Sequence, residues 1–287
     1  MEVKDLARLK AGGFMKQKQP DLFSLRVRVP VGNITASQLV KIAEIAETYG
    51  KGYVHLTTRQ GIEIPFLHFD NFAAVTDELA SVDLQPGSCG ARVRNVMACA
   101  GDRYCSHALG DSQGFGQKID ERFFGRDLPT KIKIAVAGCP NSCAKPQEND
   151  IGFMGVVEPE FEGTECINCE ICADSCPTGA ITLVEEKPTI DRSKCIYEGN
   201  CVTSCPTGSW TAKRKGYTVF VGGKLGKFPQ LGEVFAQFIS EEEGLDLTER
   251  IIEVMGTLIC DGERLGSLIN RIGLDKFKEE VSNWRRP

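Results

Sequence analysis

Gly138-Cys139-Pro140-Asn141-Ser142-Cys143 is the stretch of sequence that decides the fold, because Cys99 and Cys105 precede it and complete a set of four cysteines. The spacings, Cys99-x5-Cys105 and Cys139-x3-Cys143, are not those of a ferredoxin, and they predict a metal cluster built into an enzyme core. Four cysteines divided by a long loop could also form a structural zinc site, and spacing alone leaves that alternative open.

Seven further cysteines form a duplicated run of the bacterial two-cluster ferredoxin type. In such ferredoxins the fourth cysteine of each run binds the other cluster. We therefore expect two clusters, the first held by Cys166, Cys169, Cys172 and Cys205, and the second by Cys176, Cys195 and Cys201. Zinc is the rival for paired cysteines, but the duplication and the prolines that close both runs, Pro177 and Pro206, favour iron and sulfur.

Glu198 stands where the repeat predicts the missing cysteine of the second cluster. A carboxylate can ligate iron, and a hard oxygen in place of a thiolate would change the potential and lability of that corner. The alternative is a [3Fe-4S] cluster with Glu198 merely nearby. Spacing does not separate these two possibilities.

Composition limits the class of protein. The chain of 287 residues has ordinary apolar and charged fractions, and its net charge of -5 argues against nucleic acid as a partner. No run of about twenty apolar residues predicts a membrane span, and the N-terminus lacks the layout of a signal peptide, so a cytoplasmic location is expected. In a cytosolic chain of this size, cysteines bind metals more often than they form disulfides.

Hydrophobic periodicity predicts an α+β unit over residues 1–80. Residues 23–30 alternate between apolar and polar side chains, which predicts a strand whose arginines share one face. Residues 36–49 show the apolar spacing of a helix that ends at Gly50, and a second helix is predicted at 72–80. Between the two helices, residues 53–57 and 61–67 are predicted to be strands.

The next part of the chain, 85–127, lacks sustained periodicity and is predicted to be a site-forming loop with short helices. Residues 131–137 are predicted as a strand that places Lys131 and Lys133 on one face and Ile132 and Ile134 on the other. A strand is expected at 217–221. Helices are expected from about residues 231, 247, 262 and 274, the second with Asp246 as its N-cap.

Five stretches together resemble the family of sirohaem-dependent sulfite and nitrite reductases, over residues 12–281. They are Leu56-Thr57-Thr58-Arg59-Gln60, Arg94-Asn95-Val96-Met97-Ala98-Cys99, Leu128-Pro129-Thr130-Lys131-Ile132-Lys133, Gly138-Cys139-Pro140-Asn141-Ser142-Cys143 and Val221-Gly222-Gly223-Lys224. The inserted cysteine run most resembles the anaerobic and dissimilatory types, among them the C subunit of the anaerobic enzyme and the catalytic half of the coenzyme F420-dependent type.

The resemblance implies an α+β sulfite reductase half-repeat with an inserted ferredoxin domain. Residues 1–80 would be the ferredoxin-like N-terminal unit, 81–158 with 212–287 the sirohaem and [4Fe-4S] domain, and 159–211 the two-cluster insert. Cys99, Cys105, Cys139 and Cys143 would hold the core [4Fe-4S] cluster, with Cys143 bridging to the sirohaem iron.

The resemblance also implies roles for basic and polar residues. Arg26 and Arg94 would clamp the substrate anion, while Lys131 and Lys133 would stabilise charge and supply protons. Lysine suits the second task because burial beside other cations lowers its pKa. The expected sirohaem contacts are Arg28, Thr57, Thr58, Arg59, Gln60, Gly222, Gly223 and Lys224.

The expected activity is the six-electron reduction of sulfite to sulfide, with nitrite reduction, a non-catalytic electron-transfer subunit or a sirohaem-binding subunit as alternatives. No dinucleotide or phosphate-binding motif appears, so the electron donor is expected to be another protein, and a homo- or hetero-oligomer is expected. Cys89 and Cys260 lie outside every motif and are interpreted as small buried apolar residues. His68 and His107 are interpreted as structural or exposed.

Overall fold

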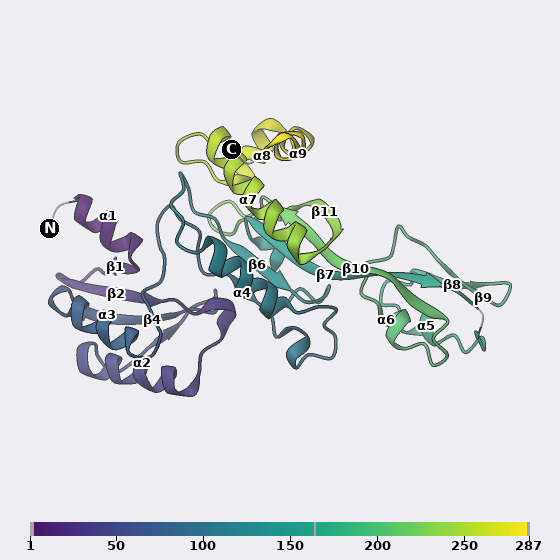
Figure 1. The fold of residues 1–287 in the computed structure, drawn as a ribbon, viewed down its shortest axis with the longest axis horizontal. Coiled ribbons are helices and arrows are strands. Elements are labelled where there is room, and N and C mark those ends of the chain that lie inside the picture. Colours follow the sequence, from purple (N-terminus) through teal and green to yellow (C-terminus); the bar gives the residue numbers. More distant parts are fainter. Residues whose placement is uncertain (1–2, 164, 286–287) are drawn as a thin grey trace.

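The computed structural model describes residues 3–163 and 165–285, which form three packed bodies along one elongated axis. Figure 1 shows the N-terminal unit at one end, a small cysteine-rich body at the other, and a central sheet between them. The N-terminal unit is a four-stranded antiparallel sheet in the order β1-β2-β4-β3. Its elements are α1 (Val3–Ala11), β1 (Phe14–Lys16), β2 (Leu22–Val27), α2 (Ala36–Tyr49), β3 (His55–Leu56), β4 (Ile62–His68) and α3 (Phe72–Ala80).

Helix α2 has the bounds that the sequence predicts, because its ends are specified locally. The hydroxyl of Thr35 accepts the N–H of Gln38 and the Gln38 side chain accepts the N–H of Thr35, a reciprocal capping box. Gly50 follows the last turn. On the inner face Ile42, Ile45 and Ala46 are buried against the sheet.

Strand β2 is shorter than predicted, and Arg26 and Arg28 meet different partners. The strand ends at Val27, and the chain then enters the short 3-10 turn η1 (Pro30–Gly32), in which Val31 has a φ of 51°. Arg28 therefore lies beyond the ladder. Burial still alternates across this segment, with Val27 and Val29 buried and Arg26 and Arg28 half-buried.

The central five-stranded sheet is mixed, in the order β11-β10-β7-β6-β5. Strands β5, β6 and β7 run parallel, whereas β7, β10 and β11 are antiparallel. Helices cover this sheet, and α7 to α9 group above it in Figure 1. The elements are β5 (Met97–Ala98), η3 (Gly101–Arg103), α4 (Ser112–Phe123), β6 (Ile134–Ala137), η4 (Pro146–Glu148), β7 (Ile151–Phe161), β10 (Trp210–Val221), β11 (Glu233–Ile239), α7 (Glu241–Leu258), α8 (Leu265–Ile272) and α9 (Leu274–Asn283).

Two predictions around this sheet are wrong. The helix expected from residue 231 is strand β11, because pairing with β10 overrides a short apolar pattern that suits either state. Helix α7 begins after Ser240, which forms a capping box with Glu243, and not after Asp246.

The region 85–127 also contains a full helix, α4. Its periodicity is masked because Gly116, Gln113 and Asp120 are buried with its apolar residues.

Strands β7 and β10 carry the third body. They pair along their whole length, from Ile151 opposite Val221 to Phe161 opposite Trp210. The segment between Phe161 and Trp210 contains α5 (Ile171–Asp174), the hairpin β8 (Ile181–Val184) with β9 (Lys187–Ile190), and α6 (Asn200–Thr203). Its small core contains Cys172, Ile181, Cys201 and Trp210.

None of the helices in the described ranges is long and apolar enough to cross a membrane.

Candidate active site

Two parallel strands bring the first cysteines together. Cys99 directly follows β5, and Cys139 follows β6 after one glycine. Because the strands are neighbours in register, with Ala98 opposite Val136, their carboxyl ends meet. The N–H of Cys99 donates to the carbonyl of Val136 at 3.1 Å and so continues the ladder into the cysteine loop.

The thiols of the two cysteine loops lie near one another. Burial raises the pKa of Cys139, and the neighbouring thiols of Cys99, Cys105 and Cys143 raise it further. The sulfur of Cys99 receives the N–H of Gly138 at 3.1 Å and lies 3.2 Å from the Ser112 hydroxyl. Such donors stabilise cluster-bound thiolates. The donor set therefore fits an iron–sulfur cluster.

A cavity of about 350 Å³ lies where the N-terminal unit meets the central sheet. Five cationic side chains line it, and none of its described lining residues carries a carboxylate. The cationic residues are Arg26, Arg59, Arg94, Lys131 and Lys133, and Thr57, Thr58, Ser88 and Asn95 are the polar neutral ones. A cavity of this composition attracts a small anion or a group that carries many carboxylates, such as sirohaem.

The two lysines reach the cavity as the sequence predicts. Lys131 and Lys133 line it, whereas Ile132 and Ile134 are fully buried in the core behind it. The alternation is confirmed, although β6 itself starts only at Ile134. The pKa of Lys133 is lowered to about 8, mainly by burial and also by the charges of Arg59 and Arg264. The charge of Asp150 opposes this shift and raises the pKa. Burial likewise lowers the pKa of Lys131.

The two arginines are held by different groups. Arg26 donates from Nε to Glu63 at 2.6 Å and from Nη1 to the sulfur of Cys89 at 3.2 Å. Burial alone would lower the pKa of Arg26, but the bonds to Glu63 and Cys89 raise it on balance. Arg94 donates to main-chain carbonyls, and burial together with the charge of Arg26 lowers its pKa.

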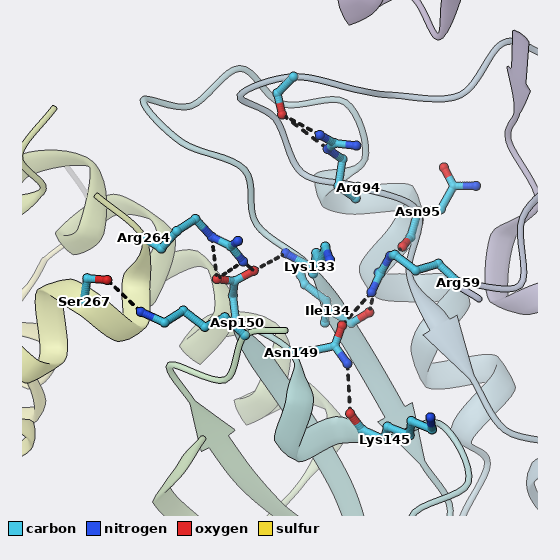
Figure 2. A network of polar contacts seen from close by, with 12 residues as sticks. Arg59, Arg94, Asn95, Lys133, Ile134, Lys145, Asn149, Asp150, Arg264 and Ser267 are labelled. Atoms are coloured by element: carbon cyan, nitrogen blue, oxygen red, sulfur yellow. Dashed lines mark hydrogen bonds and ion pairs between the residues drawn. The ribbon is translucent and has the colours of Figure 1, made fainter. Parts of the chain in front are cut away.

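Arg59 connects the cavity to the segment that follows the cysteine loop, and Figure 2 shows it beside Asn95 and Asn149. Its guanidinium donates to Asn149 Oδ1 at 2.6 Å and to the carbonyl of Asn95 at 2.9 Å. Asn149 in turn donates to the carbonyl of Lys145, which lies two residues after Cys143. The segment that follows β6 thus returns past the cysteines to the cavity and is fixed there. Burial lowers the pKa of Arg59 to about 10.

Several expected sirohaem contacts lie outside the cavity lining. Arg28 donates both Nε and Nη2 to the fully buried Asp120 of α4. The Gln60 amide exchanges two hydrogen bonds with the main chain of Ala98. Lys224 donates to the Ser267 hydroxyl at 2.8 Å.

Gly222 and Gly223 serve close packing. A Cβ on Gly223 would stand 2.2 Å from the carbonyl oxygen of Gln147, and one on Gly222, where φ is 85°, would meet Gly266 at 3.1 Å. Thr57, Thr58 and Arg59 are the expected contacts that the structure does place on the cavity.

The insert groups its cysteines as predicted, with the last cysteine of each run placed beside the earlier cysteines of the other run. One cavity is lined by Cys166, Cys169, Cys172 and Cys205, and a second by Cys176, Cys195, Cys201 and Glu198. In the described ranges, no group of three or more His, Cys, Asp or Glu side chains forms a site for a single metal ion. The thiols of each set border one cavity, and cysteine thiolates are the ligands of iron–sulfur clusters.

Polar donors in the insert face these cavities. The indole N–H of Trp210 is buried without a hydrogen-bond partner among the described residues. Burial raises the pKa of Cys172, and the nearby Trp210 indole opposes that shift. The N–H of Ala180 donates to the Cys176 sulfur at 3.3 Å and the N–H of Tyr197 to Cys195 at 3.4 Å. Both sites therefore fit iron–sulfur clusters as well.

Glu198, which lines the second insert cavity, lies close enough to His107 of the core cysteine loop to interact with it electrostatically. Burial raises the pKa of Glu198, and the nearby His107 lowers it. His107 lies two residues after Cys105. A Cβ on Gly199 would touch Val157 and Leu109, so the insert packs directly on the loop that carries Cys105.

Sequence reasoning missed the buried pair of Asp150 and Arg264 (Figure 2). Asp150 is fully buried just before β7, and its two carboxylate oxygens accept Nη2 of Arg264 at 2.6 and 2.7 Å. It also accepts Nε of Arg264 at 3.2 Å and the N–H of Lys133 at 2.9 Å. Burial raises the pKa of Asp150, and Arg264 opposes that shift. No sequence signal links two residues more than a hundred positions apart.

The fold and the site together define an iron–sulfur oxidoreductase. Residues 89–286 match the nitrite and sulphite reductase 4Fe-4S domain, and residues 15–82 match the nitrite/sulfite reductase ferredoxin-like half domain. The chain belongs to the nitrite and sulfite reductase family, as its cysteine and lysine motifs predict.

Similar proteins of known name agree with this membership. The chain is 37% identical to the coenzyme F420-dependent sulfite reductase of Methanocaldococcus jannaschii over 94% of its own length, but it spans only 44% of that relative. It is 32% identical to the C subunit of the anaerobic sulfite reductase of Salmonella typhimurium, over 90% of this chain and 82% of the relative. The crystal structure of dissimilatory sulfite reductase I has the same fold, with a TM-score of 0.75 at 20% identity over 93% of this chain and 70% of that one.

Proposed function

We propose that this chain is the catalytic subunit of a sirohaem-dependent sulfite reductase, which reduces sulfite to sulfide with six electrons. The observation that carries this proposal is the convergence of Arg26, Arg94, Lys131 and Lys133 on one cavity whose described lining has no carboxylate. Membership of the family and the two sulfite reductase relatives support the choice of substrate.

The core cysteines Cys99, Cys105, Cys139 and Cys143 would hold a four-iron cluster, and Cys143 would also bridge to sirohaem. Cys143 is exposed, which leaves its sulfur open to a second metal. Thr57, Thr58 and Arg59 would contact the sirohaem carboxylates from the cavity wall. When bound, sirohaem joined to a cluster supplies electrons in succession to a ligand on its iron.

The cationic residues would divide the work of binding and protonation. Arg26 and Arg94 are guanidinium donors that hold an anion and keep their protons, so they would bind and orient sulfite. Lys133, with a pKa of about 8, releases a proton far more readily than an ordinary lysine. It would donate protons as oxygen leaves as water, and Lys131 would hold charge beside it.

The insert would relay electrons through two clusters. The site of Cys176, Cys195, Cys201 and Glu198 faces the Cys105 loop through Glu198 and Gly199, so it would deliver electrons to the core. The site of Cys166, Cys169, Cys172 and Cys205 would receive them first, because Cys169 is exposed. The insert as a whole lies at the opposite end of the molecule from the N-terminal unit (Figure 1). Glu198 lines its site like a ligand, which favours iron ligation by its carboxylate.

An external protein or reductase subunit would donate the electrons. The F420-dependent relative is more than twice as long as the aligned region, and the Salmonella relative is one named subunit of an enzyme. Both facts support a chain that works with a further reductase domain or subunit, in a homo- or hetero-oligomer.

An anaerobic visible spectrum of the dye-reduced protein tests the proposal. Sirohaem bands that reoxidise on addition of sulfite, with release of sulfide, are expected. Nitrite in a parallel sample measures the alternative substrate. Iron–sulfur absorption without a haem band, in protein from a host that makes sirohaem, would leave only an electron carrier.

A further inference from the structure

The turn at residues 87–90 contacts both cavity arginines. The sulfur of Cys89 lies 3.2 Å from Arg26 Nη1, and Cys89 is only 1% exposed. On either side of it, the carbonyls of Ser88 and Gly90 accept the guanidinium of Arg94, the latter at 2.9 Å. One short turn therefore holds two guanidinium groups that come from distant parts of the chain.

The turn itself is fixed to the strand that carries Arg26. The N–H of Gly87 donates to the carbonyl of Arg26 at 2.6 Å, and a Cβ on Gly87 would stand 3.2 Å from the same oxygen. Gly90 has a φ of 81°, a left-handed conformation that suits glycine. Cys89 thus has little freedom to move away from Arg26.

Ser88 supplies a second and independent observation. It lines the cavity and is only 7% exposed, and its hydroxyl is buried without a hydrogen-bond partner among the described residues. Buried hydroxyls normally have a partner, so an unpaired one beside an anion cavity points to a ligand that completes it.

We propose that Cys89 is a positioning residue of the anion site, which holds Arg26 at a fixed distance from Arg94, and that Ser88 donates its hydroxyl to the bound anion or to a carboxylate beside it. This inference rests on the proposed function. It revises the interpretation of Cys89 as a small buried apolar residue.

The choice of side chain follows from what the cavity requires. A carboxylate at position 89 would neutralise Arg26, which Glu63 already pairs on its other side. An apolar residue would leave Arg26 Nη1 without this acceptor. A thiol sulfur is a weak acceptor, so it orients the guanidinium and leaves its charge available to the anion.

Four variants of the haem-loaded protein test the proposal: Cys89→Ser, Cys89→Val, Cys89→Ala and Ser88→Ala. The dissociation constant for sulfite is read from the shift of the haem band, and KM and kcat are measured with an artificial dye. Cys89→Val and Cys89→Ala should weaken sulfite binding about tenfold, as expected for a lost hydrogen bond to a charged group, with kcat changed far less than KM. Cys89→Ser keeps an acceptor and should bind almost as the natural protein does. Ser88→Ala should weaken binding severalfold.

The controls separate a local contact from general damage. Cys260 is exposed, so the interpretation of this residue as buried is wrong. It lies outside the site, and Cys260→Ser should change nothing. If Cys89→Val does not load haem, Cys89→Ala makes the same comparison with less bulk. Equal binding by Cys89→Ala and the natural protein, or equal losses in the serine and alanine variants, would overturn the inference. Absence of sulfite binding by the natural protein would instead overturn the proposed function.

Discussion

Lys133 is the residue whose environment sets the clearest pH dependence. Its pKa is lowered to about 8 by burial and by neighbouring arginines, so the free protein carries the charged form below that pH and the neutral amine above it. The proton and the positive charge are both lost as pH rises. We expect kcat/KM for sulfite to fall as pH rises through about 8.

Lys133→Arg is the control for this prediction, because sulfite itself titrates near neutral pH. Arginine keeps the charge but does not release its proton. The variant should lose about a hundredfold in kcat at neutral pH, as expected for a lost general acid, and its profile should lack the fall near pH 8. An unchanged profile in Lys133→Arg would assign the fall to the substrate.

At the scale of elements, β7 packs directly beneath the cysteine loop. A Cβ on Gly155 would stand 2.4 Å from the carbonyl oxygen of Gly138, which precedes Cys139. Gly155→Ala must therefore displace that loop. We expect a loss of about 1–3 kcal/mol in unfolding free energy, as for an overpacked core, and less iron bound per chain at the core site.

Gly256 provides the matched glycine in α7, where an added Cβ would meet nothing within 4 Å. Gly256→Ala should stabilise the protein by about 0.5–1 kcal/mol, because alanine favours the helix, and its iron content should not change. Equal iron contents in the two variants would show that Gly155 does not support the loop.

The buried pair of Asp150 and Arg264 fixes α8 to the strands that position Lys133. Asp150→Asn leaves Arg264 without its negative partner, and we expect a loss of about 3 kcal/mol in unfolding free energy, measured by denaturant titration. Because Asp150 also raises the pKa of Lys133, the fall in kcat/KM should move to lower pH. The exposed pair of Arg271 with Glu263 is the control, and Arg271→Gln should alter stability little.

At the scale of the whole molecule, the insert is separable because of how it is attached. Trp210 and Phe161 are paired at the end of the β7–β10 ladder, so a short Asn-Gly turn can join them in place of the intervening segment. The shortened protein should keep the core cluster and dye-driven sulfite reduction, and lose the iron of two clusters. Loss of the core cluster as well would show that the insert is needed for the central fold.

Local sequence determined those features whose causes lie within a few residues. The capping residues around α2 predict its bounds, the alternation at residues 131–134 predicts which lysines face the cavity, and the cysteine spacings predict the grouping of the insert sites. Together with the family motifs, these patterns predict the class of fold and all four residues expected to contact the substrate. Each depends on the period of a helix or strand or on a short loop.

Tertiary structure alone decided which partner each side chain meets. Arg28 lies in a stretch where the family resemblance predicts a cofactor contact, yet it pairs with Asp120, 92 residues away. Cys89 has no motif, yet folding places it against Arg26, 63 residues away. The strand at 233–239 exists because β10 offers it a ladder. Such contacts are chosen by packing among residues far apart in the chain, which no local pattern encodes.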